Sequence, residues 1–175
     1  MDEDIALIVP EINEQDLLKS NRKIIANPNC STIQMLLALA PIHNVCKIKR
    51  VVVSTYQSVS GAGQSAINEL KEQSKNILEG NDITIKNIPK QIAFNVVPQI
   101  DVFLDNGFTK EEMKMVNETN KILDKSITVN ATCVRVATNI GHAESIYFEL
   151  DSKLDLNQIK NIFKSKKEII FSDTD

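Results

Sequence analysis

The sequence predicts an α+β fold in which a mixed β-sheet is covered by helices on one face. Apolar residues alternate along residues 127–136 and 144–150, which is the period of a half-buried strand. Residues 64–78 and 156–164 instead carry apolar residues at helical spacing, and residues 109–123 begin with the signature of a helix N-terminus. Strands and helices are intermixed along the chain, and their connections leave room for antiparallel and crossover pairings, which favours a mixed sheet.

The first part of the chain predicts two short extended segments and a helix. Ile5–Val9 is an apolar run that a proline ends, so we expect a buried strand. Lys23–Ala26 is also short and apolar, and the Asn-Pro pair after it disfavours a helix at that point. The residues that follow predict a helix over Thr32–Ala40, which we expect Pro41 to end.

The middle of the chain predicts a strand, a tight loop and a helix. Lys49–Val59 is the strand, and the small residues Ser60-Gly61-Ala62-Gly63 form the loop. Gln64–Leu78 has the apolar spacing of a helix. Ile83–Ile85 and Asn95–Val97 predict weaker strands, because prolines lie close to both.

The last part of the chain predicts two helices and two long strands. Thr109–Leu123 begins with Thr109 and has Glu112 three residues later, which is the signature of a capping box. Ile127–Val136 and Glu144–Leu150 are strands with a loop between them, and Leu156–Lys164 is an amphipathic helix.

Composition narrows the function classes. The 175 residues are enough for one domain with its own core, and 42% are hydrophobic and 25% charged. A net charge of −3 offers no basic surface for nucleic acid or an anionic membrane. We expect no membrane span and, from Met1–Asp4, no signal peptide. The odd set Cys30, Cys46 and Cys133 has no tight spacing, which argues against disulfides or a metal site and favours a reducing cytoplasm.

One cysteine, Cys30, lies where an extended segment gives way to a helix. Unpaired backbone N–H groups and the dipole at a helix N-terminus favour negative charge, and hence the nucleophilic thiolate. The other interpretation is a small apolar cysteine beneath a helix, which is the usual role of an isolated cysteine.

Arg135 and His142 are candidate site residues from the second half of the chain. Period-two alternation puts Arg135 on the same strand face as Ile127, Val129, Ala131 and Cys133, where a charge is out of place. It either extends to solvent at the strand end or binds a carboxylate through its guanidinium. His142 follows Gly141 in a loop, where it is either solvated or an acid/base partner for a cysteine nucleophile.

Three further features are weak by themselves. Gln57 lies at the end of a strand, and surface glutamines are common there. The loop Ser60–Gly63 would let backbone approach a ligand closely, but it is no dinucleotide-binding fingerprint. On the helix 109–123, a charged stripe is typical of a solvated face, and its members are Glu111, Lys114, Glu118 and Lys121.

Taken together, several blocks resemble the aspartate-semialdehyde dehydrogenase family. They are Asn27-Pro28-Asn29-Cys30-Ser31-Thr32, Ser54-Thr55-Tyr56-Gln57-Ser58-Val59-Ser60-Gly61-Ala62-Gly63, Glu111-Glu112-Met113-Lys114-Met115-Val116-Asn117-Glu118-Thr119, Ala131-Thr132-Cys133-Val134-Arg135-Val136 and Gly141-His142-Ala143-Glu144-Ser145. Their order and spacing are specific, and they span almost the whole chain. The resemblance implies the glyceraldehyde-3-phosphate-dehydrogenase-like C-terminal (catalytic) domain.

The resemblance also implies a reaction. Cys30 matches the nucleophile that attacks the aldehyde or the acyl phosphate, His142 the acid/base partner, and Gln57 the residue that helps to hold the acyl-enzyme. The implied reaction interconverts aspartyl 4-phosphate and aspartate 4-semialdehyde through a thioester, with NADP as cofactor, in the biosynthesis of lysine, methionine and threonine.

The remaining matches concern substrate and cofactor. Arg135 matches the arginine that binds the substrate α-carboxylate, and Glu111 the glutamate that receives its amino group. Lys114 and Asn29 match phosphate-site residues. The loop of Ser60, Gly61, Ala62 and Gly63 resembles the part that approaches the nicotinamide. The family implies a homodimer.

The chain departs from the family in extent. The glycine-rich turn of the nucleotide-binding domain is absent, so we expect residues 1–25 to be a residual segment and 26–175 the catalytic and dimerisation domain. The family's carboxy-terminal remainder is missing after Asp175. Between Arg135 and His142, Val136-Ala137-Thr138-Asn139 replaces a more usual Val-Pro start. We expect the chain alone to bind NADP weakly and to be inactive.

Three alternatives remain from the sequence. The first is a reductase of another acyl phosphate, such as N-acetylglutamyl phosphate, but Asn29 and the pair Glu111 and Lys114 argue against it. The second is a non-catalytic oligomerisation fragment that keeps the site by descent. The third is a cysteine hydrolase, in which Gln57 and Arg135 would have no role.

Overall fold

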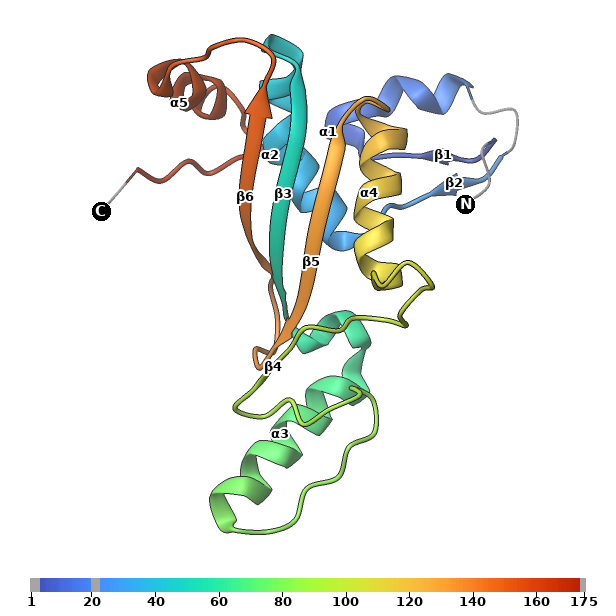
Figure 1. Cartoon of the computed structure of the whole chain (residues 1–175), viewed down its shortest axis with the longest axis vertical. Helices are drawn as coiled ribbons and strands as arrows, with labels where there is room; N and C mark the ends of the chain where they lie inside the picture. The colour runs from blue at the N-terminus through green and yellow to red at the C-terminus, as the bar shows by residue number, and fades with distance from the viewer. Residues whose placement is uncertain (1–3, 20–22, 174–175) are drawn as a thin grey trace. The chain divides into compact units, whose positions relative to one another are not determined.

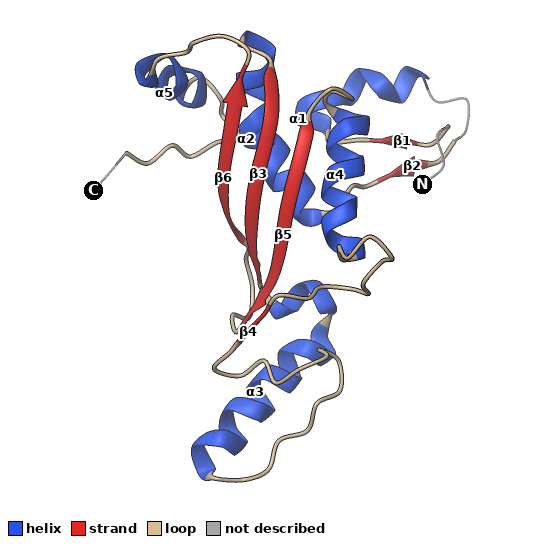
Figure 2. Ribbon diagram, in the orientation of Figure 1, coloured by secondary structure: helices blue, strands red, loops and turns tan. Residues whose placement is uncertain are grey.

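Three long strands lie side by side in a four-stranded sheet of order β4-β5-β3-β6 (Figures 1 and 2). In this computed structural model, which describes residues 4–19 and 23–173, the strands are β3 (Ile48–Gln57), β4 (Val96–Val97), β5 (Thr128–Val136) and β6 (Ala143–Leu150). β4 pairs antiparallel with β5. A separate pair, β1 (Ala6–Leu7) and β2 (Ile25–Ala26), is parallel. The predicted α+β class is therefore confirmed.

Two of the long strands, β3 and β5, have one buried face, which the alternation predicted for β5. Val51, Val53 and Thr55 of β3 are buried, whereas Arg50 and Tyr56 are exposed. Ala131, Cys133 and Arg135 are the buried residues of β5, and the residues between them are more exposed. Because side chains alternate across a strand, the other face of β3 and β5 is the more exposed one.

The described chain divides into two compact units that interleave along the sequence. Unit 1 contains the chain up to Val52, Lys114–Asn130 and the part from Ile146 onward. Unit 2 contains Val53–Met113 and Ala131–Ser145. The predicted boundary between residues 25 and 26 stays a prediction, and residues 1–3 and 20–22 of that leading segment lie outside the described residues.

The first elements of unit 1 are shorter than predicted. β1 covers only two residues of the expected strand Ile5–Val9, although Leu7, Ile8 and Val9 are buried as expected. The proline after this run begins helix α1 (Pro10–Asn13), because the first turn of a helix needs no N–H from it. A 3₁₀ helix, η1 (Glu14–Lys19), follows.

Helix α2 (Cys30–Val45) is longer than predicted, and the expectation that Pro41 ends it is wrong. Pro41 has no N–H, so the helix loses one backbone hydrogen bond at that turn. The residues beyond it are nevertheless buried, since Ile42 is fully buried and His43 is only 3% exposed. Burial of an apolar side chain such as Ile42 contributes roughly 1.5–3 kcal/mol, which offsets most of the cost of the proline.

Unit 2 is built around helix α3 (Gln64–Glu79), which follows the 3₁₀ turn η2 (Val59–Ala62). Gly80 ends α3 in the left-handed conformation that glycine favours. The helix contributes Ala66 and Leu70 to one hydrophobic core, whose other buried members are Val59, Ile88, Ile92, Ala93 and Val97.

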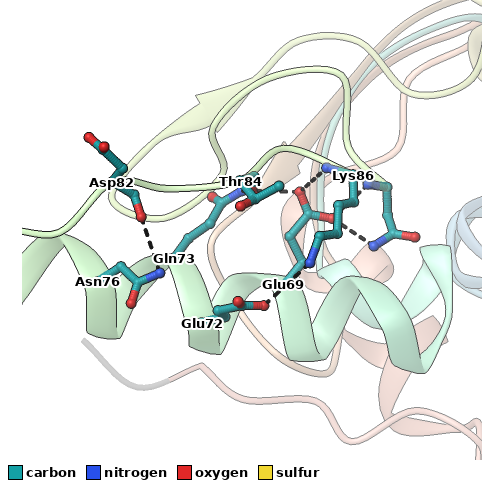
Figure 3. Close-up of polar contacts among 8 residues, drawn as sticks. Glu69, Glu72, Gln73, Asn76, Asp82, Thr84 and Lys86 are labelled. Carbon is teal, nitrogen blue, oxygen red and sulfur yellow. Dashed lines mark hydrogen bonds and ion pairs between the residues drawn. The ribbon is translucent and has the colours of Figure 1, made fainter.

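The segment after α3 contains no strand at Ile83–Ile85, so that prediction is wrong. Side chains of α3 hold this segment instead (Figure 3). Glu69 accepts the backbone N–H groups of Lys86 and Asn87, and Gln73 accepts those of Ile92 and Ala93. The segment therefore satisfies its backbone through side chains rather than through a sheet.

Two predicted helix starts are confirmed. Helix α4 (Lys110–Ile122) has the reciprocal capping box: Thr109 N–H donates to Glu112 Oε2 over 2.7 Å, and Glu112 N–H to Thr109 Oγ1 over 3.3 Å. Helix α5 (Leu156–Lys164) has the predicted bounds and a capping box formed by Asp155 and Gln158. The α4 start was predicted from two residues three positions apart, whereas the α5 start was predicted from amphipathic spacing and its capping box was not foreseen.

Candidate active site

Cys30 is the first residue of helix α2 and is exposed. The preceding Asn29 caps the helix: its Oδ1 accepts the N–H groups of Ser31 over 3.0 Å and Thr32 over 3.2 Å. The predicted position of Cys30 in the first turn of a helix is confirmed. The thiol therefore lies beside the end of a helix at which negative charge is stabilised.

A carboxylate of helix α4 holds this helix start in place within unit 1. Glu118 Oε2 accepts the backbone N–H of Asn29 over 2.8 Å, and Glu118 is only 8% exposed. The interaction connects residues 89 positions apart in the sequence. It fixes the residue next to Cys30, and sequence reasoning assigned Glu118 no such role.

The expectation that the charged stripe of α4 is a solvated face is therefore wrong. Glu111 is 5% exposed and Glu118 is 8% exposed. Lys114 and Lys121 are half-buried, and Lys121 Nζ donates to the Ile5 carbonyl over 2.7 Å. Glu118 can be buried because one of its oxygens accepts the Asn29 N–H in place of water.

In unit 2, Ser58 brings Arg135 and His142 to the same short segment. Arg135 Nη1 donates to the Ser58 carbonyl over 2.8 Å, and Arg135 is only 7% exposed. The Ser58 backbone N–H donates to His142 Nδ1 over 3.1 Å. Ser58 Oγ lies 3.3 Å from the same nitrogen and 2.8 Å from Ser60 Oγ. Arg135 thus does not extend to solvent, and the first of its two interpretations is excluded.

Gly61 is where the loop comes close to both side chains. A Cβ atom added at Gly61 would lie 2.9 Å from Arg135 Nη1 and 3.7 Å from His142 Cε1 and Nε2. The loop is also tied to the segment before His142, because Val59 N–H donates to the Thr138 carbonyl over 3.0 Å. The absence of a side chain at Gly61 lets the backbone approach the guanidinium and the imidazole ring.

Gln57, at the end of β3, is buried rather than at the surface. It is 1% exposed, and its Nε2 donates to Thr55 Oγ1 over 3.2 Å. The expectation of a common surface glutamine is therefore excluded, and its amide is held by the strand that carries it.

Carboxylates surround Cys133 on the buried face of β5. Burial, and then the charges of Glu111, Glu112 and Glu144, raise the pKa of the Cys133 thiol to about 12. Glu112 Oε1 also accepts the Cys133 backbone N–H over 3.1 Å, so the capping glutamate of α4 joins this helix to β5. Burial raises the pKa of the Glu144 carboxyl to about 8, and neither of its oxygens has a hydrogen-bond partner.

Within unit 2 the structure brings together three of the predicted site residues, Arg135, His142 and Gly61. Ser58 links Arg135 with His142, and Gly61 lies against both. Glu111 lies at the start of α4 in the same unit. In unit 1, Asn29 and Cys30 begin α2, and Lys114 lies on α4. Sequence reasoning missed Ser58 and Glu118, which act through backbone contacts, so no local pattern marks them.

Other kinds of site are not found in the described ranges. No group of three or more His, Cys, Asp or Glu side chains there could hold a metal ion. None of the helices within 4–19 and 23–173 is both long and apolar enough to cross a membrane.

Comparison with known proteins identifies the family. The semialdehyde dehydrogenase, dimerisation domain, family matches residues 39–175. The chain belongs to this family. The Aquifex aeolicus aspartate-semialdehyde dehydrogenase is 50% identical over 99% of the chain and 52% of its own length. This semialdehyde dehydrogenase dimerisation domain thus spans about half the length of the curated relatives it matches.

Solved structures confirm the predicted fold. The Vibrio cholerae aspartate semialdehyde dehydrogenase II, in a structure named as complexed with ASA, has a TM-score of 0.93 and 51% identity over 95% of this chain and 50% of its own. The Candida albicans enzyme, named as solved with NADP, has a TM-score of 0.62 and 23% identity, and supports the fold alone. The semialdehyde dehydrogenase dimerisation domain therefore has the predicted glyceraldehyde-3-phosphate-dehydrogenase-like catalytic fold.

Proposed function

We propose that this chain is the catalytic and dimerisation part of an aspartate-semialdehyde dehydrogenase. The reaction would interconvert aspartyl 4-phosphate and aspartate 4-semialdehyde with NADP, in the biosynthesis of lysine, methionine and threonine. The observation that carries the proposal is the 51% identity and TM-score of 0.93 to the Vibrio cholerae protein named as complexed with ASA. The contacts of Arg135 and His142 with Ser58 in unit 2 support it.

Cys30 is the proposed nucleophile. Its sulfur adds to the aldehyde carbon and forms a thiohemiacetal, from which a hydride leaves to give a thioester. An oxygen of phosphate then attacks the acyl carbon, the C–S bond breaks, and the thiolate leaves as aspartyl 4-phosphate forms. The exposure of Cys30 at the N-terminus of a 16-residue helix supports this role. We propose His142 as the acid/base partner and Gln57 as a residue that helps to hold the acyl-enzyme.

The other predicted residues would bind substrate and cofactor. Arg135 would bind the α-carboxylate, and Glu111 the α-amino group, while Asn29 and Lys114 would contact phosphate. NADP, when bound, would supply the hydride acceptor. The loop Ser60–Gly63 fits a close approach to the nicotinamide, because Gly61, Ala62 and Gly63 are exposed and a Cβ at Gly63 would meet no atom within 4 Å.

The test uses a hybrid protein in which this chain replaces the matching half of the Vibrio cholerae relative. We expect NADP reduction that requires both aspartate 4-semialdehyde and phosphate, and its loss in Cys30→Ser. Cys46→Ser is the matched control, because Cys46 is buried and its thiol contacts Ser152 Oγ at 3.0 Å. On the chain alone, aspartate 4-semialdehyde should slow the alkylation of Cys30 but not of Cys46. A folded hybrid without activity, or activity that survives Cys30→Ser, would contradict the proposal.

We also infer that the chain forms a homodimer. The family is described as a dimerisation domain. Large side chains on the open strand faces support this, since Tyr56 is 44% and Tyr147 is 60% exposed. Sedimentation equilibrium at tens of micromolar, roughly the range in which standard-size interfaces hold, should show a dimer. A monomer throughout this range would contradict it.

A cytoplasmic location is proposed from the thiols. Cys30, Cys46 and Cys133 are all free, which suits a reducing compartment. Fractionation of the source cells with an antibody to the chain would test it, and recovery only from an oxidising compartment would count against it.

A further inference from the structure

Thr55 lies two residues before Gln57 on strand β3, so the two side chains share one face of the sheet. Both are buried: Thr55 is 0% and Gln57 is 1% exposed. Gln57 Nε2 donates to Thr55 Oγ1 over 3.2 Å. The Gln57 amide is therefore held by a buried hydroxyl, and this hydroxyl belongs to a residue that has no role in the proposed reaction.

The direction of this hydrogen bond also orders the hydroxyl. An amide nitrogen can only donate, so Thr55 Oγ1 accepts and its own hydrogen remains available. The Thr55 side chain hydrogen-bonds the side chain of Cys133 on the neighbouring strand β5. Burial raises the pKa of the Cys133 thiol to about 12, so the sulfur stays neutral and is a weak acceptor for the Thr55 hydrogen. The hydrogen bonds thus run in one direction, from Gln57 through Thr55 to Cys133.

Contacts with the backbone hold both ends of this series of hydrogen bonds. Cys133 N–H donates to Glu112 Oε1 over 3.1 Å, at the start of α4. The residue after Gln57 accepts Arg135 Nη1 with its carbonyl over 2.8 Å. All of these residues belong to unit 2. The hydroxyl of Thr55 is therefore fixed relative to the strand end that carries Gln57.

The two ends of a glutamine amide are chemically different, because the oxygen only accepts and the nitrogen only donates. An amide without a partner can turn about its last bond and present either end to a ligand. Thr55 holds Nε2 on its own side, so Gln57 presents Oε1 and the second Nε2 hydrogen in one arrangement. Groups that are oriented in advance stabilise an intermediate without having to turn during the reaction.

We propose that Thr55 is a positioning residue whose hydroxyl oxygen fixes the orientation of the Gln57 amide. The use of this orientation rests on the proposed function, in which Gln57 helps to hold the acyl-enzyme. Because Thr55 is fully buried, it acts on the substrate through Gln57. The contact between the two side chains is independent of the reaction, so it can be tested on the chain alone.

A double-mutant cycle tests the contact by urea unfolding of the full chain. Thr55→Val removes the hydroxyl and leaves the buried Nε2 without an acceptor, so we expect the unfolding midpoint to fall. In the Gln57→Met chain the same substitution should lower the midpoint less, because no amide donor is left unpaired. Thr132→Val is the matched control, since Thr132 is exposed on β5, and it should change the midpoint little. Equal effects of Thr55→Val in the two chains would overturn the proposal.

The orientation of the amide can be observed by nuclear magnetic resonance, with Gln57→Met to assign the side-chain signals. A hydrogen-bonded N–H resonates at lower field than a free one. We therefore expect one Gln57 amide hydrogen to move upfield in Thr55→Val but not in Thr55→Ser, which keeps a hydroxyl. If neither amide hydrogen moves in Thr55→Val, the hydroxyl contacts the amide oxygen instead, and the proposal is overturned.

The positioning role is tested by kinetics of the hybrid protein. A neutral hydrogen bond corresponds to about three- to tenfold in rate, so we expect Thr55→Val to lower kcat by about that factor and Thr55→Ser to retain most of it. In the Gln57→Met hybrid, Thr55→Val should lower kcat no further, because the group that Thr55 positions is already absent.

Two kinetic results would overturn the positioning role. One is a loss of the same size when Thr55→Val is made in the Gln57→Met hybrid, which is the result for a merely structural residue. The other is an equal loss in Thr55→Ser and Thr55→Val. An inactive unmodified hybrid would instead contradict the proposed function, and the amide resonances of the chain alone would then decide the orientation.

Discussion

Replacing Glu69 with glutamine should destabilise the chain by about 3 kcal/mol at pH 7. The Glu69 side chain is 4% exposed and projects from α3 toward the segment that follows this helix (Figure 3). Oε1 accepts Lys86 N–H over 2.9 Å and Gln73 Nε2 over 3.0 Å. Oε2 accepts the N–H and the side-chain Nδ2 of Asn87, each over 2.7 Å.

The expected loss of stability follows from the number of hydrogen-bond acceptors that the side chain offers. Each carboxylate oxygen receives two donors, and glutamine keeps one oxygen only, so two donors lose their partner whichever way the amide is turned. One of the two is a backbone N–H. An unsatisfied donor costs about 1–3 kcal/mol when it is buried. The bonds from Lys86 and Asn87 are only partly buried, so we take about 1.5 kcal/mol for each lost partner, or about 3 kcal/mol for two. In a chain of this size that corresponds to a fall in melting temperature of about 6–12 °C.

The pH dependence has a definite sign. Burial raises the pKa of the Glu69 carboxyl, but the hydrogen bonds from Lys86 and Asn87 outweigh it and hold the pKa below the usual 4.5. The unfolded chain therefore binds this proton more readily than the folded chain does. The stability that Glu69 contributes is complete above pH 4.5 and is lost as the pH falls through the lower folded value.

Urea unfolding followed by circular dichroism measures both effects. Glu72→Gln is the matched control, because Glu72 lies on the same helix but is 58% exposed and only 3.8 Å from Lys86 Nζ in a surface ion pair. Such a pair is worth about 0–1 kcal/mol. The difference in the free energy of unfolding between the Glu69 and Glu72 variants should be large at pH 7 and become smaller below about pH 4.5. Equal unfolding midpoints for the two variants at pH 7 would refute the reasoning.

Four further expectations concern the site. Gly61→Ala should lower kcat/KM of the hybrid about tenfold with little change in melting temperature, because its Cβ would lie 2.9 Å from Arg135 Nη1; unchanged kinetics would contradict it. Arg135→Lys should lower kcat/KM by about 10- to 100-fold, mostly through KM, whereas a loss matched by a collapsed melting temperature would make Arg135 structural. Brief iodoacetamide treatment with mass mapping should label Cys30 before Cys133, since burial raises the pKa of the latter thiol to about 12. Glu144→Gln should be more stable than the unmodified chain at about pH 9 but not at about pH 5. The folded carboxyl has a pKa of about 8 against the usual 4.5, so between these values the unfolded chain loses the proton that the folded chain keeps, and the unmodified chain loses stability as the pH rises. Urea unfolding midpoints at both pH values check the sign.

Local signals in the sequence predicted the elements that local chemistry determines. The capping box of Thr109 and Glu112 marks the start of α4, and the bounds of α5 agree with its amphipathic spacing. The alternation along β5 likewise predicted that Arg135 shares the buried face of the strand. In each case the groups that interact lie within a few residues of one another, so their spacing is visible in the sequence.

Errors arose where distant residues outweigh a local rule. Pro41 is a valid stop signal by itself, but the burial of Ile42 and His43 keeps α2 helical beyond it. Ile83–Ile85 has the composition of a strand, yet Glu69 and Gln73 of α3 occupy the backbone groups of the following residues. Tertiary contacts determine the structure of these two segments, because intrinsic helix and strand propensities contribute less free energy than those contacts do.

The contacts that hold the site residues in place could not be predicted from the sequence, for a different reason. Glu118 accepts the N–H of Asn29, Glu112 accepts that of Cys133, and His142 accepts that of Ser58. In each pair the donor is a backbone N–H, which is the same group at every residue except proline and so leaves no mark in the sequence. Only the accepting side chain can be recognised in advance. A motif therefore identifies the groups that would do chemistry, whereas the bonds that orient them require the fold.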